Sequence, residues 1–70
     1  MLDLVEELRS ACQQAPPGDK VLTVHLFGIR NAARLRGTNM RDFAGQAGVG
    51  KKFGPEIYKG VRLSEFVKII

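Results

Sequence analysis

Hydrophobic positions recur at helical intervals along most of this 70-residue chain. At its start, one face of a predicted helix is apolar and consists of Leu2, Val5, Leu8 and Cys12, while charged and amide residues fill the other face. The segment Ala15-Pro16-Pro17-Gly18-Asp19 ends this helix, because a residue before proline is displaced from helical geometry and Pro-Gly favours a turn. The chain therefore begins with an amphipathic helix and a turn.

Residues 20–27 fit two kinds of element. Thr23 and His25 alternate with apolar residues, as in a half-buried strand. An apolar stripe at helical spacing instead runs through this segment and beyond it, and comprises Leu22, Leu26, Ile29 and Ala33. Because a lone strand would leave its backbone groups unpaired, we expect one helix over residues 20–36, with Gly28 weakening its interior by about 1 kcal/mol.

A short helix is predicted between Gly37, which ends the preceding one, and Gly48. Thr38 or Asn39 is its cap, because such side chains accept a hydrogen bond from a free N–H of the first turn. Asp42 falls in that first turn, where the helix dipole favours an anion. The result is a helix of little more than two turns.

Two more helices complete the predicted bundle. Residues 51–59 form the first of them, and Gly54-Pro55 either moves its start to Pro55 or distorts its first turn. Gly60 is expected to end it. The last helix is predicted from an apolar stripe of Leu63, Phe66, Val67 and Ile70. The pattern as a whole predicts one compact all-α domain over residues 1–70, a bundle of about five short helices.

Composition supports a folded domain and removes several kinds of site. Hydrophobic residues make up 44% of the chain and charged residues 26%, which is an ordinary globular balance. One cysteine and one histidine exclude an intramolecular disulfide and a Cys/His zinc site. No stretch is apolar enough to cross a membrane, and the start MLDLVEELR lacks the basic-then-apolar order of a signal peptide. We expect a cytoplasmic protein without metal or other cofactor.

The net charge of +4 is unevenly distributed. Residues 1–19 hold four carboxylates and one arginine, whereas residues 20–70 hold ten Lys or Arg and three carboxylates, so the net charges are −3 and +7. A positive field favours nucleic acid or other anionic partners. Many basic domains bind no nucleic acid, so charge alone leaves a solvated basic face as the alternative.

The sequence Gly45 to Lys51 fits the first seven positions of the phosphate-binding loop G-x-x-x-x-G-K-[ST]. The eighth position must supply a hydroxyl for magnesium, and Lys52 stands there. The segment also follows a predicted helix instead of a buried strand, and 70 residues cannot form the parallel sheet that carries such a loop. Nucleotide hydrolysis is therefore not expected.

No catalytic group of side chains can be assembled from this composition. His25 lies among apolar neighbours, without a second histidine, and we expect it to be a partly buried structural residue. Cys12 lies on the apolar face of the first helix with only Arg9 near it in sequence, which predicts an inert thiol. We expect no enzymatic activity.

Residues 39–60 resemble the helix-turn-helix motif of bacterial transcriptional regulators. Ala44 matches the small residue where the two helices of the motif cross, Gly48 matches the turn glycine with its positive φ, and Val49 matches the buried residue after the turn. The expected core contacts of the motif are Phe43, Ala47 and Ile57. Gly54-Pro55 departs from the pattern, which has a branched apolar residue at the first of these positions and a regular helix around them.

A longer stretch, from HLFGIRNAARL to KGVRLSEFV, is similar to small bacterial helix-turn-helix-like domains. The resemblance implies a small DNA-binding protein, a transcriptional regulator that binds double-stranded DNA. The alternative is a protein–protein interaction module that keeps the fold without binding DNA, for which Gly54-Pro55 is the main argument.

The resemblance also assigns roles to charged residues. Lys51 and Lys52 lie at the start of the second motif helix, which enters the major groove, and Glu56 and Lys59 lie about a turn further along. Phosphate contacts are expected from Arg41, Arg62, Arg34 and Arg36.

Assembly has two alternatives. The apolar first and last helices either meet across the two-fold axis of a homodimer or pack on the Leu22–Leu26–Ile29 stripe of the same chain.

Overall fold

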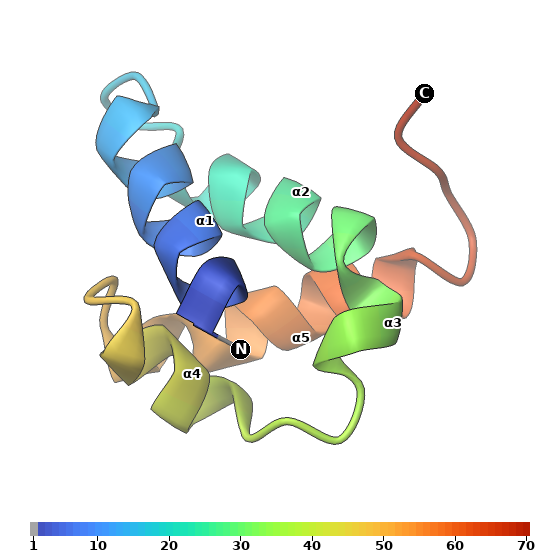
Figure 1. Ribbon diagram of the computed structural model, residues 1–70. Helices are drawn as coiled ribbons and strands as arrows, with labels where there is room; N and C mark the ends of the chain where they lie inside the picture. Colours follow the sequence, from blue (N-terminus) through green and yellow to red (C-terminus); the bar gives the residue numbers. More distant parts are fainter. Residues whose placement is uncertain (1) are drawn as a thin grey trace.

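The computed structural model describes residues 2–70, and every regular element in this range is a helix (Figure 1). The elements in chain order are α1 Leu2–Gln14, α2 Lys20–Arg30, α3 Ala32–Leu35, α4 Met40–Gln46, the 3₁₀ turn η1 Lys51–Phe53, and α5 Gly54–Leu63. The predicted all-α bundle of five helices is confirmed, although its helix boundaries differ from the expected ones.

Helix α5 is the central element of the bundle. It makes its most extensive contact with α2 and also touches α3 and α4, while α1 lies beside α2 (Figure 1). The largest fully buried side chains come from these helices and are Phe27, Leu4, Leu8, Leu35, Ile57 and Val24. The ring of Phe27 stacks on that of Phe43 with centroids 5.8 Å apart, which joins α2 to α4 across this core.

Helix α1 confirms the predicted N-terminal amphipathic helix, with its apolar face shifted in register. Leu4, Val5 and Leu8 are buried, whereas Leu2 is 81% exposed. Cys12 is partly buried at the edge of the core, and burial raises the pKa of its thiol despite the opposing charge of Lys20. A raised pKa keeps the thiol protonated, and the thiolate is the reactive form, so this environment is consistent with the expected inert thiol.

The choice of helix over strand for residues 20–27 is confirmed, but the single helix over residues 20–36 is wrong. The helix is interrupted at Asn31, a buried residue that separates α2 from α3. Its Nδ2 donates to Phe27 O (3.2 Å) and to Glu7 Oε2 (2.8 Å). A side-chain amide that bonds to a backbone carbonyl of the preceding turn competes with the backbone hydrogen bonds of a helix. At Asn31 this competition separates the two helices.

The predicted apolar stripe of α2 is not in the core. Leu22 is 55% exposed and Leu26 is 37% exposed, while the buried face is formed by Val24, Phe27 and Gly28. Gly28 explains this choice of face, because a Cβ there would lie 2.5 Å from the backbone oxygen of Ile57. Beyond weakening the helix interior, this glycine is the point at which α2 approaches α5.

The end of the chain also differs from the prediction. Gly60 does not end α5 but lies buried inside it, against the backbone of His25, and the helix continues to Leu63. The predicted last helix is absent, since residues 64–66 form a turn and 67–70 have no regular structure. The hydroxyl of Ser64 donates to the carbonyl of Val61 and so ends α5, while Phe66 is left 78% exposed.

Candidate nucleic-acid interface

Helices α4 and α5 form a helix-turn-helix. The side chain of Asn39 caps α4 by accepting from the backbone N–H of Asp42 at 3.1 Å, so Asn39 is the cap and Thr38 is not. Gly48 has a φ of +76°, as the turn requires, and Val49 N donates back to Ala44 O at 3.2 Å. The side chains expected in the core of the motif, Phe43, Ala44, Ala47, Val49 and Ile57, are all buried.

The start of the second helix shows why Gly54-Pro55 occurs there. The chain passes through η1 before α5 begins, and Pro55 occupies the first turn of α5, where its missing N–H breaks no helical bond. Of the two alternatives left by the sequence, the structure agrees with the start at Pro55, because α5 begins at Gly54 with Pro55 in a regular first turn. Gly54 is buried, and a Cβ at this position would lie 2.9 Å from the Cα of Arg41. Glycine therefore replaces the branched residue of the usual motif because the start of α4 lies against it.

Two cations from outside the motif hold its turn, and neither role was predicted from the sequence. Arg9 of α1 donates to Ala47 O (3.3 Å) and to Gln46 O (3.0 Å), the carbonyls at the end of α4. Lys20 of α2 donates to Val49 O (3.0 Å), and its ammonium lies 4.4 Å from the centre of the Phe53 ring. Cations at a helix C-terminus satisfy carbonyls that have no helical partner. The hydrogen bonds to Ala47 O and Val49 O span 38 and 29 residues of sequence, so no local sequence pattern predicts them.

Four of the predicted contact residues are exposed cations on the second half of the motif, namely Lys51, Lys52, Lys59 and Arg62. The stem of Lys51 covers Gly45 of α4, and the ammonium of Lys52 lies 5.7 Å from the centre of the Phe53 ring. Arg41 is exposed in the first turn of α4. The motif thus presents its cations to solvent from η1 to the end of α5.

Glu56, another predicted contact, joins α5 to α2. One oxygen of its carboxylate lies 2.7 Å from His25 Nε2, and the other lies 3.5 Å from Lys59 Nζ. The hydrogen bond with His25, assisted by Lys59, lowers the pKa of Glu56. His25 is partly buried, as predicted, and the structure supplies the carboxylate that is not near it in sequence.

Arg36 and Arg62 both line a hollow of about 500 Å³ between the α3–α4 connection and α5. Tyr58 and Met40 lie on its walls, and Glu65 lies at its edge. Arg62 Nε lies 3.3 Å from Glu65 Oε2, and the Tyr58 hydroxyl and Glu65 together raise the pKa of the guanidinium. The hollow brings two of the predicted phosphate contacts to one place.

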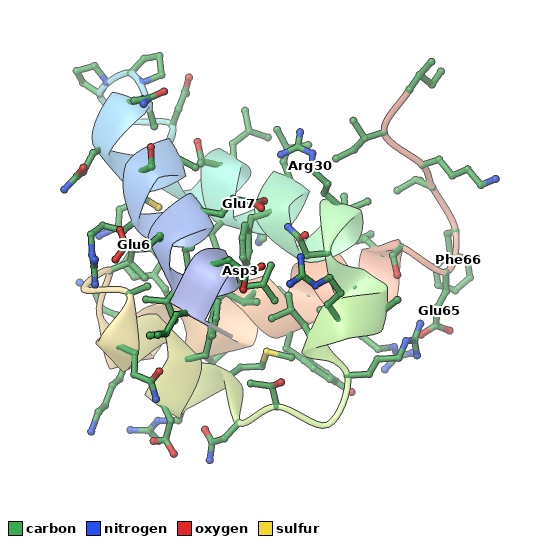
Figure 2. All side chains as sticks on the ribbon, viewed as in Figure 1. Asp3, Glu6, Glu7, Arg30, Glu65 and Phe66 are labelled. Carbon is green, nitrogen blue, oxygen red and sulfur yellow. The ribbon has the colours of Figure 1, made fainter. Side chains whose placement is uncertain are left out.

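Arg34 points elsewhere. Its Nη2 donates to Asp3 Oδ2 at 2.7 Å, which ties α3 to the start of α1. This hydrogen bond is the main reason why the pKa of Asp3 falls to about 2. Figure 2 shows Asp3, Glu6 and Glu7 together on α1, so Arg34 belongs to the acidic side of the molecule and is not grouped with the cations of α5.

A helix, a turn at a glycine with positive φ, and a second helix packed on the first are the defining features of helix-turn-helix domains. The chain belongs to the HTH-like domain family. Its sequence matches this family over residues 2–70, which covers the helix-turn-helix and the helices around it. No curated protein and no solved structure gave a match. None of the helices within residues 2–70 of this HTH-like domain combines the length and hydropathy needed to cross a membrane.

In the HTH-like domain, the carboxylates of the second helix and of the turn after it are engaged by other side chains. Glu56 is engaged by His25, and Glu65 by Arg62. Backbone phosphates are recognised by exposed Lys and Arg side chains of this kind. The same outward face also carries Pro55, and Tyr58 with half of its surface exposed.

Proposed function

We propose that this HTH-like domain is a small DNA-binding protein, a bacterial transcriptional regulator that acts in the cytoplasm on double-stranded DNA. The observation that supports it is the set of exposed cations on the second half of a well-formed helix-turn-helix, Lys51, Lys52, Lys59 and Arg62. Family membership supports the same class of function. The proposed role is binding, without catalysis and without a cofactor.

In this proposal each cation has a position-dependent role. Lys51 and Lys52, in η1 directly before the second helix, enter the major groove, and Lys59 follows about two turns later. Arg36 and Arg62 bind one phosphate in the hollow that they both line, and Arg62 exchanges Glu65 for it.

Three further residues complete the set of proposed contacts. Arg41 reaches the phosphate backbone from the first turn of α4. Glu56 and Arg34 are engaged by His25 and Asp3, so each contributes only by exchanging that partner for DNA.

Two copies would suit such a regulator. A two-fold axis would present two second helices to successive major grooves about 34 Å apart. Sedimentation equilibrium in the presence of DNA separates this homodimer from a monomer that binds a single half-site.

The test is binding to a random-sequence duplex, followed by fluorescence anisotropy over a series of salt concentrations. We expect the binding constant to fall steeply with salt concentration. Each substitution that leaves one phosphate without its cation should reduce the slope of the logarithm of this constant against the logarithm of salt concentration by about one. The variant Lys51→Ala/Lys52→Ala should weaken binding to all sequences. Its matched control is Arg30→Ala/Lys68→Ala, which removes the same charge from residues away from the motif. Equal weakening by the two variants would show that only net charge matters and would overturn the proposed interface.

The second candidate, a protein-interaction module, is favoured by one observation. The outward face of α5 exposes Pro55 and Tyr58 beside its cations. Leu63, at the end of the helix, and Phe66, in the turn after it, line one pocket with Tyr58. Aromatic and Arg anchors of this kind are typical of protein interfaces. Absence of DNA binding by the wild-type protein at low salt would select this candidate.

A further inference from the structure

Helix α2 carries an apolar ridge on its outer face, formed by Leu22, Leu26 and Ile29. These three side chains follow one another at intervals of four and three residues, which is the spacing of a seam between two helices. The first two are exposed, and the third is partly buried. The opposite face of α2 already packs on the core through Val24 and Phe27, so the ridge faces away from the body of the domain.

The ridge continues into a groove of about 280 Å³ where the chain passes the end of α2 after leaving α5. Ile29 belongs to both features, and Val67 and Ile69 add apolar side chains to the lining of the groove. Figure 1 shows the C-terminal segment rising from the end of α5 toward this part of α2. We call the ridge and the groove together the α2 outer surface.

Two cations lie in the groove, at the Ile29 end of this surface. Arg30 and Lys68 line the groove, together with Ser64 as its polar neighbour, and Figure 2 shows Arg30 at the end of α2. Within residues 2–70 neither cation makes an ion pair, and no carboxylate lines the groove. Apolar side chains bordered by unpaired cations suit a partner that is itself apolar and acidic.

We propose that the α2 outer surface binds an acidic amphipathic helix of another protein. The leucines or isoleucines of that helix, at intervals of three and four residues, would lie along Leu22, Leu26 and Ile29, as in helix-in-groove recognition. Its flanking Asp or Glu side chains would pair with Arg30 and Lys68. This surface contains none of the residues assigned to DNA, so the inference does not rest on the proposed function.

A second copy of the chain fits this surface less well. Two copies meeting there would bring Arg30 and Lys68 of each against the same cations of the other, and like charges across an interface oppose association. The acidic helix of this chain is α1, but its apolar side chains Leu4, Val5 and Leu8 are buried in its own core. A second copy therefore offers no acidic helix with a free apolar face.

The experiment uses a designed fluorescein-labelled peptide helix of about four turns with leucines at heptad spacing and glutamates elsewhere. One control peptide replaces the glutamates with lysines, and another replaces the leucines with serines. Anisotropy with the full chain should show binding of the acidic leucine peptide and at least about tenfold weaker binding of both controls. Leu22→Ser/Leu26→Ser should weaken binding by a similar factor, and Arg30→Gln/Lys68→Gln should weaken it and reduce its salt dependence. Leu2→Ser is the matched control, because Leu2 is an exposed leucine on another helix, and should leave binding unchanged.

Three outcomes would overturn the proposal. Equal binding of the acidic and basic peptides, or binding of neither, would show that the surface does not select an acidic helix. Concentration-dependent self-association of the free chain, abolished in Leu22→Ser/Leu26→Ser, would assign the surface to a second copy. Methyl contacts in the NMR spectrum of the free protein between Ile70 and Leu22 or Leu26 would show that the chain covers the ridge itself. Circular dichroism of the variants confirms that each is folded.

Discussion

Helix α5 is fixed by two contacts that both depend on glycine, in different ways. Where it crosses α2, Gly28 and Gly60 bring the two backbones together, and a Cβ at Gly28 would lie 3.0 Å from the Cα of Gly60. Where it joins α4, Gly48 has nothing within 4 Å of an added Cβ but has a φ of +76°. The crossing with α2 requires the absence of volume, as does Gly54 against Arg41 of α4, whereas the turn at Gly48 requires a backbone conformation. Substitutions that add volume and substitutions that restrict φ should therefore affect the two contacts unequally.

The largest effect is expected for Gly60→Ala. The added methyl group meets backbone atoms of His25 and Gly28 in α2, which cannot move aside as a side chain can. We expect destabilisation of about 3 kcal/mol, at the upper end of overpacking effects, and a fall in Tm of about 15 °C for a domain of this size. Thermal unfolding followed by circular dichroism measures it.

The matched control for Gly60→Ala is Gly45→Ala, which adds the same methyl group inside α4. There the neighbouring atoms belong to the flexible stem of Lys51. Alanine is the better helix former, so we expect no loss of stability and a gain of up to about 1 kcal/mol. Equal destabilisation by the two variants would contradict the close crossing of α2 and α5.

Gly48→Val is expected to have an intermediate effect. A β-branched residue is strained at positive φ even where space is open, and the cost should be about 1–3 kcal/mol. Gly48→Asn adds a side chain that tolerates this conformation, so it should retain most of the stability. An unchanged Tm in Gly48→Val would show that the turn does not depend on the conformation of this glycine.

The smallest effect should come from Glu56→Gln, which acts on the α2–α5 contact through charge. Because His25 lowers the pKa of Glu56 in the folded protein, the ionised carboxylate stabilises the fold above its ordinary pKa near 4.5. This stabilisation disappears as the pH falls through the lowered pKa. Urea unfolding should therefore show Glu56→Gln to be less stable than wild type at neutral pH, with the difference vanishing as the pH falls below the lowered pKa of Glu56.

The partner of Glu56 supplies the control. In a His25→Gln background, Glu56→Gln should change the pH dependence of stability much less, because the main cause of the pKa shift is gone. The same pH dependence in both backgrounds would assign the shift to a different neighbour.

Local sequence was sufficient for the helix-turn-helix. The positive φ of Gly48 and the burial of Ala44 were predicted, and the cap was narrowed to Thr38 or Asn39, because each involves groups within a few residues of one another. The same holds for the exposed cations of η1, because lysines beside a turn remain in water unless a distant element covers them.

Contacts between distant segments were not predictable in this way. The stripe that includes Leu22 and Leu26 has better helical periodicity than the face that includes Phe27, and periodicity identifies a face without saying what covers it. Gly28 and Gly60 decide which face is buried, but each is also an ordinary helix breaker when read alone. The error at Gly60 and the error in the α2 stripe therefore have one cause.

The candidate site shows the same division. Its cations were predicted, but the side-chain hydrogen bonds of Glu56 with His25 and of Arg34 with Asp3 each span 31 residues and depend on the packing of separate helices. These pairs change which of the predicted side chains are available to a ligand.

The bonds from Arg9 and Lys20 to the turn carbonyls limit how this motif can be reused in protein engineering. A designer who grafts residues 40–63 onto another scaffold transfers both helices but leaves Ala47 O and Val49 O without their donors. The recipient scaffold would need a cation opposite each of these oxygens. Without such a cation, nothing outside the motif would fix the angle between the grafted helices. The transferable unit is therefore the motif together with two side chains from helices α1 and α2.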